Sequence, residues 1–145
     1  AERDRVWAAR RSALAALSRA KPTSILEDVT VPLPKLAEMI SIVQQIAAQL
    51  NVTIGTFGHA GDGNLHPTIL TDERDTEEMG RVEMAIERLI DAALELGGTV
   101  SGEHGIGFSK APFLEREVGP GSLAVMRRIK SALDPNNILN PGKFV

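Results

Sequence analysis

Cysteine is absent from this 145-residue sequence, and its formal net charge at pH 7 is only -3. Without cysteine the chain has no disulfide, thiolate metal site, cysteine-ligated iron-sulfur cluster or cysteine nucleophile. The weak, dispersed charge offers no basic surface, so nucleic acid is not expected as a partner. Charged residues interrupt every apolar stretch before the roughly 18–20 residues that a membrane span requires. We therefore expect a cytoplasmic protein without a transmembrane segment. Partner subunits could hold this protein at a membrane surface.

The length and the hydrophobic content of 43% suffice for one ordinary core, so residues 1–145 are expected to form a single domain. The sequence starts at Ala1, with a helical pattern already under way. This start suggests a fragment of a longer protein.

Helical and strand patterns alternate along the chain. Apolar residues at positions i, i+3, i+4 and i+7 predict helices, and runs rich in β-branched residues predict strands. Thr71 or Asp72 is the expected N-cap of the third helix. The expected helices cover about residues 2–19, 36–50, 72–96, 110–118 and 122–133, and the expected strands about 24–31, 52–57, 65–70 and 99–100. This order predicts an α+β fold: an antiparallel sheet covered by helices, as in ferredoxin-like sandwiches, with extra C-terminal helices.

Two of the three histidines, His59 and His66, flank a glycine-rich turn in GHAGDGNLHP at 58–67. Asp62-Gly63 is a favoured pair for a two-residue hairpin turn, which would place His59 directly opposite His66. Opposed residues share one face of a sheet, with Cβ atoms about 4.5–5.5 Å apart. Both imidazoles would then reach one ion.

Glu103, in SGEHGIG at 101–107, is the candidate third ligand. Two histidines and one carboxylate form a set suited to zinc, manganese or iron, with coordination positions left open for substrate. Alternatively, His59 and His66 are only a cross-strand polar pair. The adjacent His104 is a candidate ligand or general base, or else caps a loop. The glycines of this stretch do not follow the order of a dinucleotide-binding loop.

These two stretches, together with LDPNNILNPGKF at 133–144, resemble the C-terminal domain of FAD-linked oxidases. The sequence is most similar to the branch with glycolate oxidase FAD-binding subunits and D-lactate dehydrogenases. That branch is related to D-2-hydroxyglutarate dehydrogenases and belongs to the vanillyl-alcohol oxidase superfamily. The resemblance implies that an N-terminal domain missing from this chain binds FAD, while this domain shapes the substrate site.

The resemblance also implies residue roles. His59, His66 and Glu103 would hold a divalent metal, and His104 would remove the hydroxyl proton of a 2-hydroxy acid while hydride passes to flavin. Arg10 matches an arginine that pairs with the substrate carboxylate, the alternative being an exposed helical arginine.

Two further positions bear on specificity and on the flavin seam. Thr68 stands where the hydroxyglutarate relatives have asparagine, which favours a smaller 2-hydroxy acid such as glycolate or D-lactate. Asn140 lies in the tail segment that returns toward the flavin domain and either contacts the cofactor or anchors that seam.

The implied function is thus the substrate-site domain of a flavin-dependent oxidoreductase, inactive by itself. It would act with its own FAD domain and with an electron-transfer partner subunit. The alternatives are a stand-alone metal- or anion-binding module and a small metallohydrolase that uses Glu103 or His104 as base.

Overall fold

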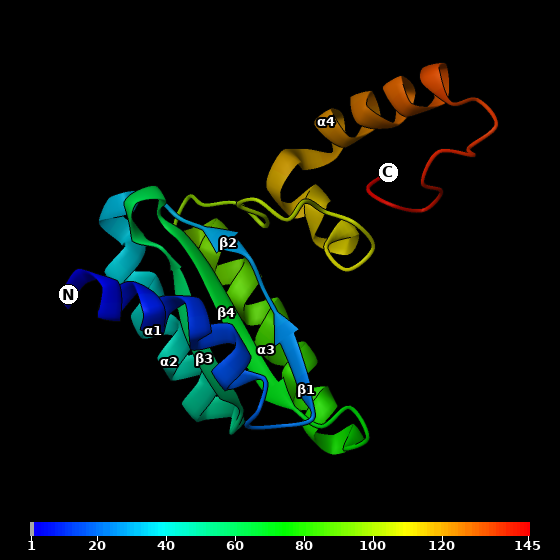
Figure 1. Cartoon of the computed structure of the whole chain (residues 1–145). Helices are drawn as coiled ribbons and strands as arrows, with labels where there is room; N and C mark the ends of the chain where they lie inside the picture. The colour runs from blue at the N-terminus through cyan, green and yellow to red at the C-terminus, as the bar shows by residue number, and fades with distance from the viewer. Residues whose placement is uncertain (1) are drawn as a thin grey trace.

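The computed structural model describes residues 2–145 and has an antiparallel sheet with helices on both faces (Figure 1). The helices are α1 (Glu2–Leu17), α2 (Leu36–Leu50), α3 (Thr76–Glu95) and α4 (Ala111–Leu133), with short 3-10 turns η1 (Leu33–Lys35) and η2 (Ala60–Asp62). The strands are β1 (Thr23–Leu26), β2 (Val29–Thr30), β3 (Thr53–His59) and β4 (Asn64–Thr71). The predicted α+β class is confirmed.

Strand β4 is the centre of the sheet. It pairs with β3 on one side and with β1 and β2 on the other, always antiparallel. An isolated bridge between Thr30 and Thr99 adds a short fourth position beyond β2, in the region predicted as a short strand. The resulting order is that of a ferredoxin-like split β-α-β sandwich.

The predicted strand 24–31 is interrupted at Glu27 and Asp28 rather than continuous. Its register against β4 is nevertheless the same on both sides of the gap, with Leu26 opposite Thr68 and Val29 opposite Leu65. The interruption lies opposite Pro67, whose carbonyl accepts from the Glu27 N–H at 2.8 Å. Because proline has no N–H to donate in return, the ladder is broken at this point.

The main core lies between the sheet and the pair α2 and α3. Alternate strand residues point into it, and the predicted apolar stripes of both helices meet them. Fully buried members include Val29, Met39, Ile69, Val82 and Leu89.

The N-cap of α3 differs from the prediction. Asp75, and not Thr71 or Asp72, accepts hydrogen bonds from the backbone N–H groups of Glu77 and Glu78. A cap must stand two or three residues before the N–H groups that it satisfies, and the helix starts later than expected.

Helix α4 and the tail extend away from the sandwich (Figure 1). Gly119, with φ of 75°, interrupts α4 just before Pro120, which agrees with two predicted helices that meet there. Within residues 2–145 no helix is long and apolar enough to cross a membrane.

Candidate active site and metal centre

The candidate site lies on the face of the sheet opposite to α2 and α3. Leu65 and Ile69 of β4 belong to the core cluster, so the alternating residues Asn64, His66 and Thr68 point to the other face. All three are buried there, although α2 and α3 cover only the other face. The cover comes from α1 and from the loop of residues 99–110.

The hairpin between β3 and β4 differs from the predicted two-residue turn. Strand pairing places His59 opposite Asn64, and His66 opposite Phe57. The loop contains the 3-10 turn η2, followed by Gly63 in the left-handed region with φ of 70°. A side chain on Gly63 would overlap the Val31 carbonyl, so only glycine fits this junction.

The corrected register still brings the two histidines together. His59 and His66 are diagonal rather than direct neighbours, and a slip of two positions keeps both on one face. Their ring centroids are 5.5 Å apart in an edge-on arrangement. The proximity expected from sequence is therefore present, although the pairing expected to produce it is wrong.

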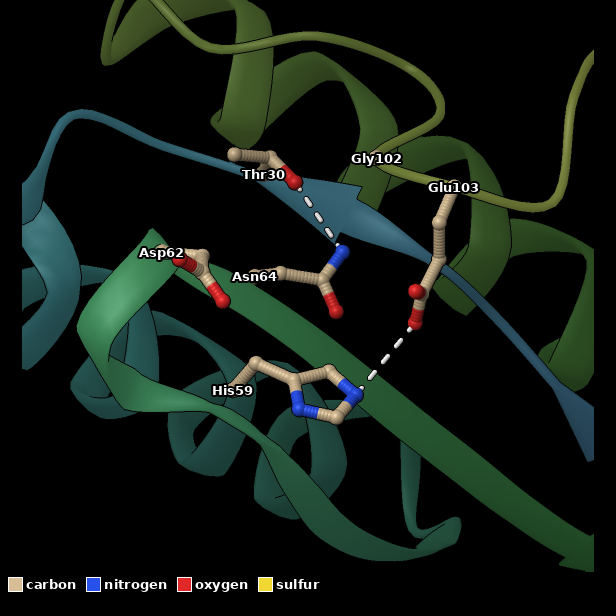
Figure 2. A pocket seen from close by; sticks show the side chains of 6 residues that line it. All are labelled: Thr30, His59, Asp62, Asn64, Gly102 and Glu103. Carbon is tan, nitrogen blue, oxygen red and sulfur yellow. Dashed lines mark hydrogen bonds and ion pairs between the residues drawn. The ribbon is translucent and has the colours of Figure 1, made fainter.

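Glu103 reaches both imidazoles from the loop that follows α3. Its Oε1 atom lies 2.8 Å from His66 Nε2 and 3.5 Å from His59 Nε2, and Figure 2 shows the carboxylate directed toward His59. One ligand atom from each of these three residues lies within 4.8 Å of the others. His66 is buried, whereas His59 and Glu103 are half exposed, so the cluster opens on one side.

This donor set fits a divalent cation. Two imidazole nitrogens and one carboxylate oxygen suit zinc, manganese or iron, and the exposed side leaves room for further ligands. Asn64 adds an orphaned polar atom, because its Oδ1 is buried without a hydrogen-bond partner. In Figure 2 this oxygen points into the pocket between His59 and Glu103, while the amide nitrogen faces Thr30.

His104 presents its imidazole beside the same cluster. Its ring stacks on the buried His66 ring, with centroids 5.1 Å apart and an interplanar angle of 9°. The residue is exposed, and its backbone N–H is fixed by a hydrogen bond of 2.8 Å to Asp28 Oδ2. The His66 ring and the backbone hydrogen bond to Asp28 thus hold an accessible imidazole in place. Such an imidazole can take a proton from a group bound in the pocket.

Asp28 anchors the loop from below and is fully buried. Burial alone would raise the pKa of its carboxyl group. Four hydrogen bonds outweigh this effect and hold the pKa well below its usual range. The donors are the backbone N–H groups of His104 and Glu103 and the side chains of Asn64 and Ser101. The group is therefore an anion beneath the candidate ligands.

Lys110 ties the other end of the loop to the sheet. Its buried ammonium donates to the carbonyls of Asp28 and Val100 at 2.5 and 2.7 Å. Burial lowers the pKa of Lys110, and burial raises the pKa of nearby Glu27, 3.9 Å away. These contacts hold the loop on the edge of β2.

Arg10 lies near this region on α1. Its guanidinium stands over the Phe57 ring at 4.8 Å, and Phe57 in turn contacts the His66 ring. Arg10, Trp7 and His59 also line one open pocket. The contact with Phe57 places Arg10 beside the histidines. Its pairing with a substrate carboxylate stays a prediction.

Asn140 lies in the exposed C-terminal tail and has a positive φ of 49°. It lines a hollow with Gly107, Lys130 and Phe144, and the Phe144 N–H donates to the Gly107 carbonyl. The tail thus returns to the loop that carries His104. No contact between the described residues joins Asn140 to the histidine cluster, and its predicted role stays a prediction.

Sequence reasoning missed Asp28 and Asn64. Asn64 lies in the glycine-rich motif at 58–67 and Asp28 in the expected strand 24–31, and neither pattern by itself predicts a functional role. The sequence does contain a signal for Asp28: two adjacent carboxylates in a β-branched run, where buried charge requires several partners.

A substitution of Gly102 tests how closely this loop is packed. A methyl group at position 102 would overlap Asn64 Nδ2 and Thr30 Oγ1. We expect Gly102→Ala to displace the loop and to lower the free energy of unfolding by about 1–3 kcal/mol. Thermal unfolding of the full-length protein measures this loss of stability. Gly61→Ala is the control, because space there is open; equal effects of both variants would contradict the packing argument.

Comparisons with known proteins agree with the motifs. The family model described as FAD linked oxidases, C-terminal domain, matches residues 1–144. The chain is 56% identical over 136 residues to glycolate oxidase subunit GlcD of Bacillus subtilis, covering 94% of this chain and 29% of that protein. It is 42% identical over 145 residues to the probable mitochondrial D-lactate dehydrogenase of Danio rerio, covering 99% and 29%.

A third relative is the mitochondrial D-lactate dehydrogenase (cytochrome) of Arabidopsis thaliana, 39% identical over 142 residues, covering 97% of this chain and 25% of that protein. The chain thus spans less than a third of the length of these relatives. The family match nevertheless covers almost all of the chain and includes both histidine motifs. The chain belongs to the family of C-terminal domains of FAD-linked oxidases.

Proposed function

We propose that this chain is the substrate-site domain of a longer flavoprotein that oxidises a small 2-hydroxy acid to the 2-oxo acid. The observation that carries the proposal is the cluster of His59, His66, Glu103 and His104 on one open sheet face of an FAD-linked oxidase domain. The names of the relatives, glycolate oxidase subunit and D-lactate dehydrogenase, support the substrate class. FAD would be bound mainly by a domain outside residues 1–145.

His104 is the proposed general base. It would accept the proton of the substrate hydroxyl as the carbon-oxygen double bond forms and the α-hydrogen leaves with its electron pair. A bound flavin supplies the acceptor for that hydride. Stacking on His66 limits rotation of the His104 ring, and the residue is exposed, so a bound substrate can reach it.

His59, His66 and Glu103 are the proposed ligands of a divalent cation. A cation held there would polarise the substrate hydroxyl and fix its orientation. The half-exposed positions of His59 and Glu103 support this role, because substrate oxygens need an open coordination side.

Arg10 is the proposed partner of the substrate carboxylate, a role suited to its planar guanidinium. Its place in a pocket with His59 supports this assignment. Thr68 supports a small substrate only through its difference from the hydroxyglutarate relatives, since in this fold the residue is fully buried.

The remaining assignments concern the surroundings of the domain. We propose that the tail around Asn140 contacts the flavin domain, since it is exposed and returns to the His104 loop. We also propose that the protein is cytoplasmic and passes electrons to a partner subunit. If that subunit lies at a membrane, the protein would be held at the membrane surface. A cysteine-free composition is compatible with a reducing compartment.

A panel of 2-hydroxy acids tests the proposed function. The full-length flavoprotein is mixed anaerobically with glycolate, D-lactate, L-lactate or D-2-hydroxyglutarate, and flavin absorbance is followed. We expect rapid bleaching by glycolate or D-lactate and slow bleaching by D-2-hydroxyglutarate. A flavin that no member of the panel reduces would contradict the proposal. A metallohydrolase would instead hydrolyse esters or amides as this chain alone with added metal, an outcome that family membership disfavours.

A further inference from the structure

The Asp28 carboxylate receives its hydrogen bonds from the candidate site. Asn64 Nδ2 donates to Oδ1 at 2.7 Å, and Ser101 Oγ donates to Oδ2 at 2.9 Å. The backbone N–H groups of Glu103 and His104 both donate to Oδ2 at 2.8 Å. One buried anion thus holds the backbone of a candidate metal ligand and of the candidate base.

Asp28 also lies next to His66, its neighbour on the adjacent strand β4. The strand register that pairs Leu26 with Thr68 and Val29 with Leu65 places residue 28 opposite residue 66. The Asp28 Oδ1 atom lies 3.9 Å from His66 Nδ1, and that nitrogen is buried without a hydrogen-bond partner. The other nitrogen, Nε2, points to Glu103 and the open side of the cluster.

This arrangement constrains the His66 tautomer. An imidazole that ligates a cation through Nε2 carries its proton on Nδ1, and ligating histidines commonly direct that proton to a carboxylate. At His66 the acceptor that faces Nδ1 is Asp28 Oδ1. A shift of about 1 Å would bring the two atoms from 3.9 Å to the usual hydrogen-bond distance of about 2.9 Å.

Asp28 also fixes the orientation of the Asn64 side chain in the pocket. Its amide nitrogen donates to Asp28 Oδ1 and to Thr30 Oγ1, at 2.7 and 3.0 Å. With both amide hydrogens engaged, the oxygen is left to face His59 and Glu103 (Figure 2). The orientation of this acceptor therefore depends on the anion beneath it.

We propose that Asp28 is a positioning residue for the metal centre. It fixes the Nδ1–H tautomer of His66 and the backbone that carries Glu103 and His104, and does not itself touch substrate or metal. The inference rests on the proposed function in one respect, namely that His59, His66 and Glu103 hold a divalent cation.

The test compares Zn²⁺ binding by full-length flavoprotein variants. In Asp28→Asn, an amide replaces the anion and lacks the charge that faces His66. We expect its Zn²⁺ affinity to fall about 10–100-fold, the usual cost of removing such a partner of a ligating histidine. Asp72→Asn is the matched control, because Asp72 is also an aspartate with a lowered pKa, about 2, but pairs with Arg74 at the far end of β4. The control should bind Zn²⁺ like the parent.

A spectroscopic measurement separates positioning from a purely structural role. In NMR spectra of the Zn²⁺-loaded parent, we expect the His66 Nδ1–H proton to resonate downfield and to exchange slowly with water, as a proton donated to the Asp28 carboxylate would. This measurement also decides the proposal if Asp28→Asn fails to fold or to retain flavin. A Zn²⁺-loaded parent whose His66 Nδ1–H exchanges rapidly with water, or whose His66 binds Zn²⁺ through Nδ1, would overturn it.

Each result of the titration has a distinct consequence. If Asp28→Asn binds Zn²⁺ within about twofold of the parent, the positioning role is wrong while the metal centre stands. If the parent itself binds no Zn²⁺, the metal centre of the proposed function is wrong and the positioning role falls with it. Flavin reduction by substrate, measured separately, reports on the oxidoreductase assignment in both cases.

Discussion

A full-length protein that carries His104→Ala is expected to keep its bound flavin but to be reduced by 2-hydroxy acid about 10²–10⁴-fold more slowly than the parent. The substitution removes the imidazole that would take the hydroxyl proton. It leaves the backbone N–H that Asp28 holds, so the loop keeps its anchor. Anaerobic stopped-flow measurement of flavin bleaching gives the rate, and the visible spectrum reports flavin content.

Two controls separate loss of the base from damage to the loop. Ser109→Ala changes an exposed residue of the same loop and should react like the parent. Added imidazole should partly restore reduction of His104→Ala, because the space left by the ring can admit a free base. A rate equal to that of the parent would show that His104 is not the base.

The second large effect is expected for His66→Ala, which should lose the bound divalent metal. Elemental analysis of the parent should find about one ion per chain, and that of the variant close to none, because one of three protein ligands is missing. The buried ring also contacts Phe57, His59 and His104. Its removal should therefore lower the free energy of unfolding of the metal-free protein by about 1–3 kcal/mol.

His59→Ala is the matched variant for this prediction. It removes a second ligand of the same type, but its side chain is 49% exposed whereas that of His66 is 4% exposed. We expect the same loss of metal and a smaller loss of stability, since little packing disappears with an exposed ring. If neither the parent nor the variants contain stoichiometric metal, the histidines are a cross-strand polar pair and the metal assignment is wrong.

Much of the fold could be read from local patterns. The helical repeat of α2 and the β-branched runs predicted the elements and their order, because burial of one face imposes a period of 3.6 in helices and 2 in strands. The α+β class followed from that order. The break in α4 at Gly119 agrees with the two helices expected at 110–118 and 122–133.

The errors share a cause in tertiary contacts. The hairpin register depends on how Gly63 packs against Val31, which is 32 positions earlier in the sequence. A turn preference between neighbouring residues carries no information on such a contact, so the two-residue turn was the wrong choice. The position of the α3 cap was likewise decided by where the chain leaves β4, not by the type of residue available.

The sequence alone indicated the candidate ligands and the candidate base, because histidines and a glutamate in glycine-rich motifs are recognisable without coordinates, but it did not indicate Asp28 or Asn64. It also predicted correctly that both histidines share one face of the sheet, since a register error of two positions preserves the alternation of side chains. Only the tertiary structure placed Glu103 and His104 over Asp28, residues about 75 positions apart that meet through hydrogen bonds to one carboxylate. The physical reason is that a buried anion is stable only where several donors converge, and the fold alone brings these donors together.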